Sequence, residues 1–292
     1  MASSTTAAET SLHVRSVSLP SQVHPTTLWI VEELQKLKTF VESSVSTVPS
    51  MTREMISDRL RQLANMYDGI EDLLQLPSIQ QGLFYSDQRK WLEEDVEGLM
   101  RLLDLCGTMK DATTTLKEYV QDLRFALRRR GDNSTGQTVQ DYVRSRKEIQ
   151  KIIKKSYKDL KQMDGKCQSA SLVSEDPDLS VVLNVLNEAR EITRSLLCSI
   201  LSLMFLPKAK TSRWSFASKS MRVACKEDLC EMWDVDVSLR AALKDADAEK
   251  IMMVQNQLKT IEIGFGGVEN GLGYLFRRLI RNRVSLLNIL SP

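Results

Sequence analysis

The segment RSVSLP (residues 15–20) combines residue types and a spacing that suit phosphorylation chemistry. Arg15 lies three residues before Ser18, where a basophilic kinase can recognise it, and a phosphate on Ser18 would add about two negative charges for an arginine cluster to bind. The pattern R-S-x-S-x-P is the one that 14-3-3 proteins read once the second serine is phosphorylated. The alternative is an unmodified flexible segment, because short motifs arise by chance in serine-rich tails. We predict a partner motif made of Arg15, Ser16, Ser18 and Pro20.

Patterns for catalysis or metal binding are weaker. Both histidines, His13 and His24, lie in the first 25 residues, whereas a catalytic or metal-binding histidine is normally held in packed surroundings. The carboxylates of residues 93–95, Asp95 included, are interpreted as a solvated helix face. The glycine-rich segment 264–267 lacks the preceding strand and following lysine of a phosphate-binding loop. We predict no catalytic, cofactor-binding or metal-binding residue, no cofactor and no enzyme activity. An enzyme with an unrecognised site stays open as the weakest hypothesis.

Basic side chains gather in three clusters, each of which is by default a solvated helix face or loop. One cluster, Lys147, Lys151, Lys154, Lys155, Lys158 and Lys161, follows a predicted helix. The second cluster follows Pro207 and the third flanks the C-terminal helix. Together they form a candidate membrane or partner surface, because aromatic and basic side chains together suit a membrane headgroup layer. We expect no nucleic-acid binding, since the net charge of the chain is only +2. The candidate surface consists of Lys208, Lys210, Arg213, Trp214, Arg277, Arg278 and Arg281.

The helical pattern is clearest at the C-terminal end of the chain. Twelve positions there, eleven of them apolar, recur at spacings of three and four residues. Such residues share one face of a helix, so the pattern predicts a long amphipathic helix that packs as in a coiled coil. Its one polar member, Asn282, can fix the register of packed helices. The partner helix could belong to this chain, which we favour, or to a second copy. After Ile251 and Val254, the helix-packing seam comprises Leu258, Ile261, Phe265, Val268, Leu272, Leu275, Leu279, Asn282, Leu286 and Ile289.

Five glycines interrupt this helix, at positions 264, 266, 267, 271 and 273. Each costs about 0.5–1 kcal/mol in a helix interior, so together they would prevent a stable isolated helix. Burying a large apolar side chain contributes about 1.5–3 kcal/mol, and the seam provides enough of them to outweigh the glycines when another surface covers it. The sequence therefore predicts a locally loose or kinked helix that is held by packing.

The remainder of the chain is also predicted to be helical, because its apolar residues are periodic and its prolines lie at the edges of the periodic segments. Thr26 or Thr27 can cap a first helix that ends before Pro49, and a second ends at Pro77. Two long helices follow, joined by a polar turn at residues 131–136. A linker at 164–176 precedes a helix from Pro177, and Met232 opens a further apolar stripe. We predict an all-α bundle of long antiparallel amphipathic helices, with residues 26–292 as one domain after a disordered tail at 1–25.

The five cysteines indicate a reducing compartment, because they are odd in number and show no CxxC spacing. The most apolar run, residues 195–206, is shorter than the roughly 20 residues that span a bilayer. The first 25 residues lack the apolar core of a secretory signal. We therefore expect a cytoplasmic protein, with peripheral membrane association and a plastid address both left open. The oligomeric state is also open.

Both ends of the chain resemble one family. The opening HVRSVSLPS (residues 13–21), followed by His24-Pro25, is similar to the N-terminal signature of the plant BYPASS-related proteins. The closing VENGL (268–272), LFRRLI (275–280) and RVSLLNIL (283–290) are similar to the C-terminal signature of that family. Glycines at 264, 266 and 273 depart from the family pattern, where residues that favour helix are usual. The resemblance covers nearly the whole chain.

This resemblance implies an all-helical plant protein with relatives linked to root and shoot development, and it supplies no reaction, cofactor or catalytic residue. We therefore expect a non-enzymatic scaffold or regulator that acts through protein partners, 14-3-3 proteins among the candidates, and is gated by phosphorylation of Ser18. The alternative is a peripheral membrane protein that binds anionic lipid through the basic loop around Trp214 or the arginines around Leu279.

Overall fold

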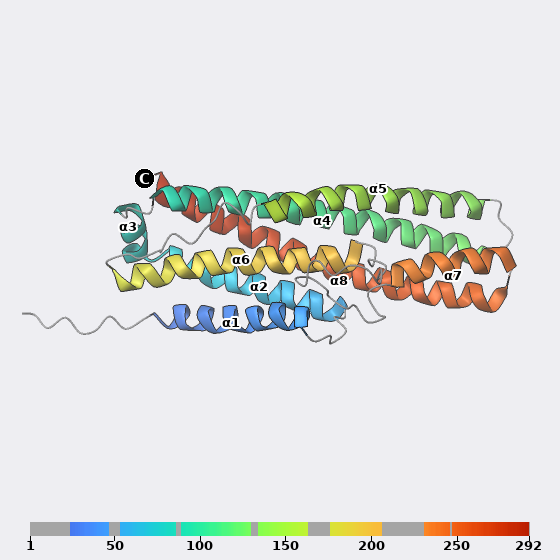
Figure 1. The fold of residues 1–292 in the computed structure, drawn as a ribbon, viewed down its shortest axis with the longest axis horizontal. Coiled ribbons are helices and arrows are strands. Elements are labelled where there is room, and N and C mark those ends of the chain that lie inside the picture. The colour runs from blue at the N-terminus through green and yellow to red at the C-terminus, as the bar shows by residue number, and fades with distance from the viewer. Residues whose placement is uncertain are drawn as a thin grey trace, which may run out of the picture.

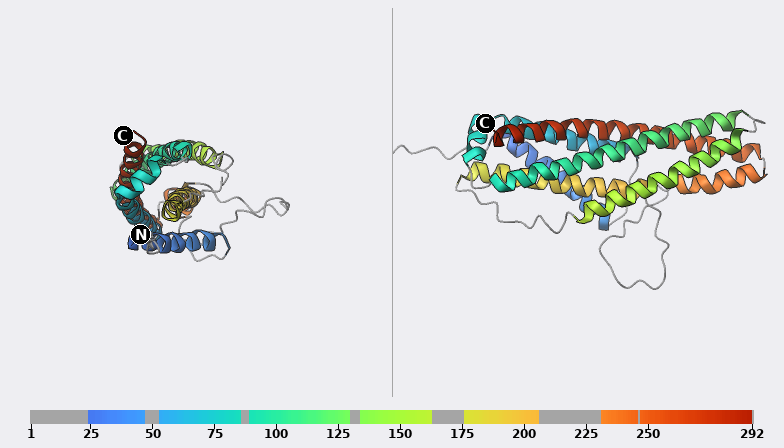
Figure 2. Two further views of the ribbon diagram at one scale, coloured as in Figure 1. Left: turned by 90° about the vertical axis from the view of Figure 1, so that its left-hand side faces the viewer. Right: turned by 90° about the horizontal axis from the view of Figure 1, so that it is seen from above.

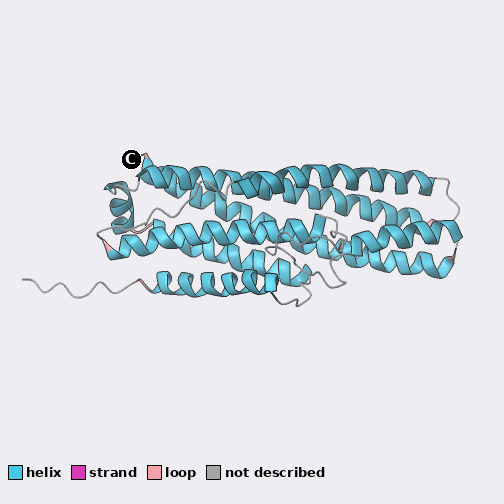
Figure 3. Cartoon of the chain, viewed as in Figure 1, coloured by secondary structure: helices cyan, strands magenta, loops and turns pink. Residues whose placement is uncertain are grey.

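The computed structural model describes residues 24–46, 53–85, 89–129, 134–162, 176–205, 231–245 and 247–291. Within these ranges the regular structure is entirely helical, as Figure 3 shows, so the predicted all-α fold class is confirmed. Residues 1–23 of the predicted tail lie outside the described part of the chain. The helices are α1 (Pro25–Ser46), α2 (Arg53–Leu74), α3 (Pro77–Tyr85), α4 (Arg89–Arg128), α5 (Ser134–Gln162), α6 (Pro177–Phe205), α7 (Glu231–Asp245) and α8 (Ala248–Leu290).

Five helices form an elongated curved layer, in the order α5, α4, α8, α2 and α1 (Figures 1 and 2). Viewed along its length in Figure 2, this layer is an open arc with α6 and α7 on its concave side. In Figure 1, α6 and α7 follow one another along the long axis, and each therefore covers a different half of the layer. The longest helix, α8, occupies the middle of the arc, and at 1.5 Å per residue it is about 64 Å long.

The two central neighbours α2 and α8 run parallel, although most sequential helices in the layer are antiparallel. Ser57 near the start of α2 donates a hydrogen bond to the carbonyl oxygen of Gly267 at 3.1 Å. Eighteen residues later, the Gln75 amide donates to the hydroxyl of Ser285 at 3.3 Å. Both partners lie 210 positions further along the chain. This constant offset shows that the two helices keep one register along their whole contact.

On its other side α8 packs antiparallel to α4. Arg89, the first residue of α4, donates to the carbonyl oxygen of Leu290 at 3.1 Å, at the end of α8. Further along α4, Gln121 donates to the Glu262 carboxylate at 2.7 Å. Because α8 has long helices on both flanks and α7 covers part of its concave side, its apolar seam is enclosed by helices of the same chain.

The helix ends show where local sequence decides the structure. The first helix begins at Pro25, and the carbonyl of His24 accepts hydrogen bonds from Thr27 and Leu28, so the predicted cap at Thr26 or Thr27 is wrong. Proline suits this first helical position because its missing N–H would have no partner there. At α8, the Asp247 carboxylate accepts from the amide of Glu249 at 2.9 Å, as expected of an N-cap.

Of two further helices, one was predicted from the sequence and one was not. The apolar stripe that starts at Met232 does form a helix, α7, as predicted. The short helix α3 was not predicted, because its nine residues carry little periodic signal; Ile79 and Leu83 are its buried anchors. No described helix combines the length and apolar character that crossing a membrane requires.

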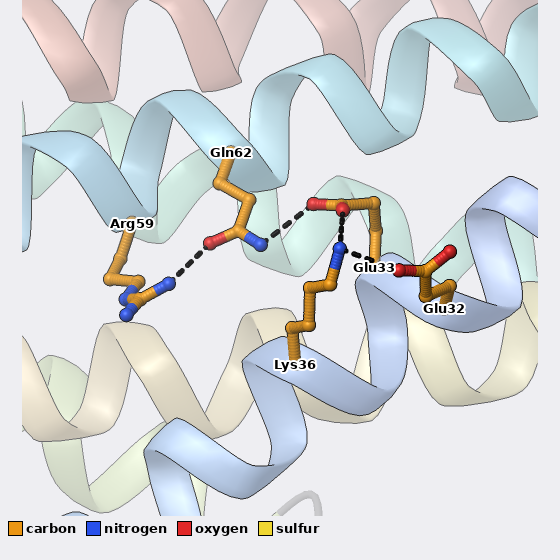
Figure 4. A network of polar contacts seen from close by, with 5 residues as sticks. All are labelled: Glu32, Glu33, Lys36, Arg59 and Gln62. Carbon is orange, nitrogen blue, oxygen red and sulfur yellow. Dashed lines mark hydrogen bonds and ion pairs between the residues drawn. The ribbon is translucent and has the colours of Figure 1, made fainter.

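A polar network fastens α1 to α2 at the rim of the arc (Figure 4). Gln62 of α2 donates to the Glu33 carboxylate at 2.7 Å and accepts from Arg59 at 2.7 Å. Lys36 bridges Glu32 and Glu33 of its own helix at 2.8 and 2.9 Å. Partial burial opposes ionisation of Glu33, but hydrogen bonds from Lys36 and Gln62 outweigh it and hold the pKa of Glu33 below its usual value.

Candidate functional site: the outer face of the C-terminal helix

Two of the predicted site groups fall outside the described residues, and the structure says nothing of them. They are the phosphorylation motif (Arg15, Ser16, Ser18 and Pro20) and the loop group (Lys208, Lys210, Arg213 and Trp214). The other predicted residues all lie on α8, which presents a buried face to the bundle and an exposed face to the outside of the arc.

All ten seam residues, from Leu258 to Ile289, are buried. Their cover comes from this chain, because α2, α4 and α7 pack around α8. The apolar seam is therefore occupied by intrachain packing. Any surface that α8 offers to another molecule must lie on its opposite face.

Asn282 shows how the polar member of the seam is accommodated. Its side-chain amide donates to the carbonyl oxygen of Tyr67 in α2 at 2.7 Å and to that of Arg278 at 3.1 Å. Its own amide oxygen has no hydrogen-bond partner within the described residues. The Tyr67 hydroxyl in turn lies 2.9 Å from the hydroxyl of Thr193 in α6. Asn282 thus links α8 to α2, as expected of a residue that fixes register at a cost in stability, and Tyr67 separately links α2 to α6.

The glycines of α8 do not interrupt its hydrogen-bonded helix, which runs without a break from Ala248 to Leu290. At Gly271 an added Cβ would come within 2.9 Å of the Leu60 Cβ, so glycine is what allows α2 and α8 to approach so closely here. Gly266 is different, because a Cβ there would meet no atom within 4 Å. The close approach of α2 therefore explains Gly271, and nothing in the described structure explains Gly266.

The arginines of the candidate surface lie along the exposed side of α8, and two of them pair with α2. Arg278 forms an ion pair with Asp68, and Arg281 lies 3.9 Å from the Glu71 carboxylate while its side chain stays 59% exposed. Arg277 instead stacks over the ring of Tyr274, with its guanidinium carbon 4.9 Å from the ring centre. Arg278 therefore contributes to the fold, Arg281 is exposed but shares its charge with Glu71, and Arg277 keeps its positive charge available on the surface.

Three large apolar side chains also stand on this outer face. Met252, Ile263 and Tyr274 are 58%, 66% and 53% exposed, and they are spaced 11 residues apart. Eleven residues make about three turns of helix, so the three side chains project in nearly the same direction. Arg277 and Arg281 follow on the same side. We call the set of Met252, Ile263, Tyr274, Arg277 and Arg281 the α8 outer face; its apolar members were not found from the sequence, which drew attention to the inner stripe alone.

A buried ion pair between α4 and α6 corrects one prediction. Asp95 was expected on a solvated face, but only 1% of the residue is exposed, and its carboxylate accepts a hydrogen bond from Arg190 at 2.6 Å. Burial raises the pKa of Asp95 to about 6, although the Arg190 charge opposes this rise. The sequence did contain a signal, because Asp95 lies three residues after Leu92 and four before Leu99, on the apolar stripe.

Above this pair lies a groove of about 610 Å³ between α4 and α6. Basic and acidic residues line it in equal number, and several of them already pair, as Arg101 does with Glu97 and Arg194 with Glu191. The groove thus presents no converging set of one charge that would select an anion or a cation. Its charged residues are Lys90, Arg101, Arg190, Arg194, Glu93, Glu94, Glu97 and Glu191.

Nucleophilic and metal-binding groups are few in the described part of the chain. Cys106 and Cys198 are free and buried, and burial raises the pKa of Cys106 to about 12, which disfavours the reactive thiolate. No three histidine, cysteine or acidic side chains among the described residues are grouped closely enough to hold a metal ion.

Comparison with known proteins places the chain in a family. A search of curated proteins and a search of solved structures each found no match. The family model described as Protein BPS1 matches residues 59–289, from the first third of α2 to the last turns of α8. That range includes the whole curved layer except α1 and the beginning of α2. The chain therefore belongs to the BPS1 family, a family linked to plant development.

Proposed function

We propose that the protein is a non-enzymatic scaffold in plant development, and that it binds a partner protein through the α8 outer face. The observation that carries this proposal is the set of exposed apolar side chains Met252, Ile263 and Tyr274, which point in nearly the same direction from a helix whose opposite face is buried. Single exposed apolar side chains are ordinary, and these three lie about 17 Å apart along α8. Their shared direction favours docking because one partner helix running along α8 could contact all three. The central position of α8 makes this face rigid, because α2 and α4 hold the helix on both flanks.

The chemistry of the face indicates the kind of partner. Ile263 and Tyr274 would meet the apolar side of an amphipathic helix. Arg277 and Arg281 follow Tyr274 on the same side of α8 and would meet acidic side chains on the flank of the partner helix, where charge-assisted hydrogen bonds are about twice as strong as neutral ones. Tyrosine and arginine are also the residue types that most often dominate binding energy at interfaces. The proposed partner is therefore a protein with an acidic amphipathic helix.

The test combines capture in plant tissue with reconstitution. Full-length protein and an Ile263→Glu/Tyr274→Glu variant are purified by affinity from plant tissue, and captured proteins are compared by mass spectrometry. A Val237→Glu/Phe125→Glu variant is the control, because these side chains are 70% and 59% exposed on α7 and α4. We expect one protein to be lost with the α8 variant alone.

That protein is then produced on its own and titrated against the three purified chains. The proposal expects direct binding that the α8 variant weakens by at least about tenfold, or 1.4 kcal/mol. If the α8 variant binds as the control does, the outer face is not the docking site. If sedimentation shows instead that the wild type forms a dimer that the α8 variant dissociates, the occupant is a second copy and the proposal of a different partner is wrong.

We also propose that phosphorylation of Ser18 controls the scaffold by recruiting a 14-3-3 protein. The support is the sequence pattern at residues 15–20, with Arg15 as the kinase determinant. A Ser18→Ala variant should lose 14-3-3 proteins in the same capture experiment, whereas Ser21→Ala, one residue outside the pattern, should keep them. Equal recovery from both variants would show that the pattern is not used.

A further inference from the structure

The lysines of α5 form one continuous exposed face. Successive residues of a helix are separated by about 100° around its axis, and on this basis five lysines share an arc of about 100° that contains no acidic residue. All five are exposed, and they extend over about 17 Å of the helix. We call them the α5 lysine face: Lys147, Lys151, Lys154, Lys155 and Lys158.

Acidic residues border this face and compensate part of its charge: exposed Glu148 follows Lys147 in α5, and Asp236 of α7 interacts electrostatically with Lys147. Asp159 and Asp141 lie on the flank toward α4, where they line the grooves between the two helices. Among the described ion pairs of α5, Arg144 pairs with Asp141 and Arg146 with Asp236 of α7. None of these pairs involves a lysine of the face.

The buried side of α5 explains why the lysines point outward. Tyr142, Ile149, Ile153 and Leu160 are its buried apolar side chains, and they lie on the opposite side of the helix from the lysines. Figure 2 shows α5 at one end of the arc, with α4 as its neighbour in the layer. A helix at the rim can meet a broad surface without the rest of the layer intervening.

We propose that the α5 lysine face docks the protein on an anionic membrane surface. Lysine is a point charge on a flexible stem, which suits a diffuse field of lipid headgroups better than a defined carboxylate or phosphate pair. The arc contains no exposed large apolar side chain of the kind that anchors a protein interface. The nearest arginine, Arg144, lies one turn before Lys147 and pairs with Asp141, and the face contains no aromatic ring for base stacking, which disfavours nucleic acid. The proposal does not depend on the α8 outer face, which lies on another helix.

Sedimentation with vesicles tests this proposal on the full chain. We compare phosphatidylcholine vesicles with vesicles that also contain about one-third phosphatidylserine, at low and physiological salt. The wild type should sediment only with the anionic vesicles, and less so as salt rises. A Lys151→Gln/Lys154→Gln/Lys155→Gln/Lys158→Gln variant should bind at least about 100-fold more weakly, since each lysine near such a surface changes the partition coefficient by about fivefold.

A matched variant removes the same charge elsewhere: Lys38→Gln/Lys90→Gln/Lys244→Gln/Lys259→Gln, all at exposed positions. It should bind nearly as the wild type does, and circular dichroism should show both variants equally helical. Equal loss in the two variants, or a wild type that ignores anionic vesicles, would overturn the proposal. So would tighter binding to duplex RNA that the α5 variant abolishes, because it would assign the face to nucleic acid.

Discussion

Asn282 of α8 and Tyr67 of α2 are joined by a 2.7 Å hydrogen bond from the asparagine amide to the tyrosine backbone carbonyl. Both residues are buried, and 215 positions separate them in the chain. In a parallel helix pair, an apolar seam alone tolerates a shift by one turn or more. A single directional bond in the seam favours one register, which here also brings Gly271 against Leu60.

Replacing Asn282 with Asp should make stability depend on pH. A carboxylate there would face the carbonyl oxygens of Tyr67 and Arg278, so its folded-state pKa would rise above the unfolded value of about 3.9. A group whose pKa is raised by folding stabilises the folded protein at pH values below its unfolded-state pKa. This stabilisation is lost as the pH rises through the folded-state pKa. The variant should be less stable by about 3 kcal/mol at pH 7, as a two-unit shift implies, and should recover toward pH 4. Urea unfolding measures this. Asn288→Asp, at an exposed position of α8, should change the free energy of unfolding by less than about 0.5 kcal/mol.

Two glycines of the same helix should respond to alanine in opposite directions. Gly271→Ala should lower the free energy of unfolding by about 1–2 kcal/mol, because the clash with Leu60 outweighs the gain in helix propensity. Gly266→Ala should raise it by about 0.5–1 kcal/mol, since a methyl group there meets no atom within 4 Å. Thermal and urea unfolding of both variants measure these changes in the free energy of unfolding. Similar effects of the two substitutions would contradict the close approach of α2 and α8 at Gly271.

Asp95 should make the protein less stable as pH rises from about 4 to 6. Burial raises the folded pKa of Asp95 to about 6 against an ordinary 3.8, so the stabilising contribution present at low pH is lost as pH rises through this window. The difference in unfolding free energy between the wild type and Asp95→Asn should fall by about 3 kcal/mol between these limits. A difference that is flat across the window would show that the carboxyl is ionised throughout.

The same ion pair gives a second, independent measurement at neutral pH. Arg190→Met should cost about 3–5 kcal/mol, because it leaves the Asp95 carboxylate buried without its partner. The double change Asp95→Leu/Arg190→Met should recover most of that loss, since two apolar side chains of similar size need no pairing. If the double variant is as unstable as Arg190→Met, the ion pair stabilises the fold by more than the neutralisation of two buried charges.

Glu33 should show the opposite pH dependence. Its pKa is held below the usual value, because hydrogen bonds from Lys36 and Gln62 outweigh the effect of burial (Figure 4). Ionised Glu33 therefore stabilises the folded protein at pH values above its unfolded-state pKa. This stabilisation is lost as the pH falls through the folded-state pKa. Glu33→Gln should therefore cost about 0.5–1 kcal/mol at pH 7 and nothing at low pH. Glu32→Gln, at a side chain that is 66% exposed, is the control and should have a smaller effect. An equal loss at both positions would argue against the bond to Gln62.

Periodic apolar residues made much of this fold predictable. The stripes of α2, α4, α5 and α8 continue for five or more turns, so they indicate both the helices and their buried faces. The α3 helix was not predicted because nine residues hold too few periods, and the start of α1 was misplaced because His24 caps through its carbonyl as well as its side chain. The charge of Asp95 predicts a surface position, whereas its place on the apolar stripe of α4 puts it in the core, where Arg190 pairs with it.

The candidate site was harder to predict, for a physical reason. The α8 outer face consists of scattered residues such as Ile263 and Tyr274, which a sequence cannot mark as exposed until the opposite face is known to be covered. The parallel pairing of α2 with α8 is equally hidden, because contacts across 210 positions leave no local pattern.

Site-specific photo-crosslinking from α8 tests the central claim most directly. A photoreactive side chain replaces Ile263 in full-length protein expressed in plant tissue, with Val237 on α7 as the control position, and crosslinked peptides are sequenced by mass spectrometry. We predict one partner protein crosslinked from position 263 and not from 237, through a peptide that is amphipathic and acidic. Equal crosslinking from both positions, or a peptide from a second copy of this chain, would contradict the proposed docking of a partner helix on α8.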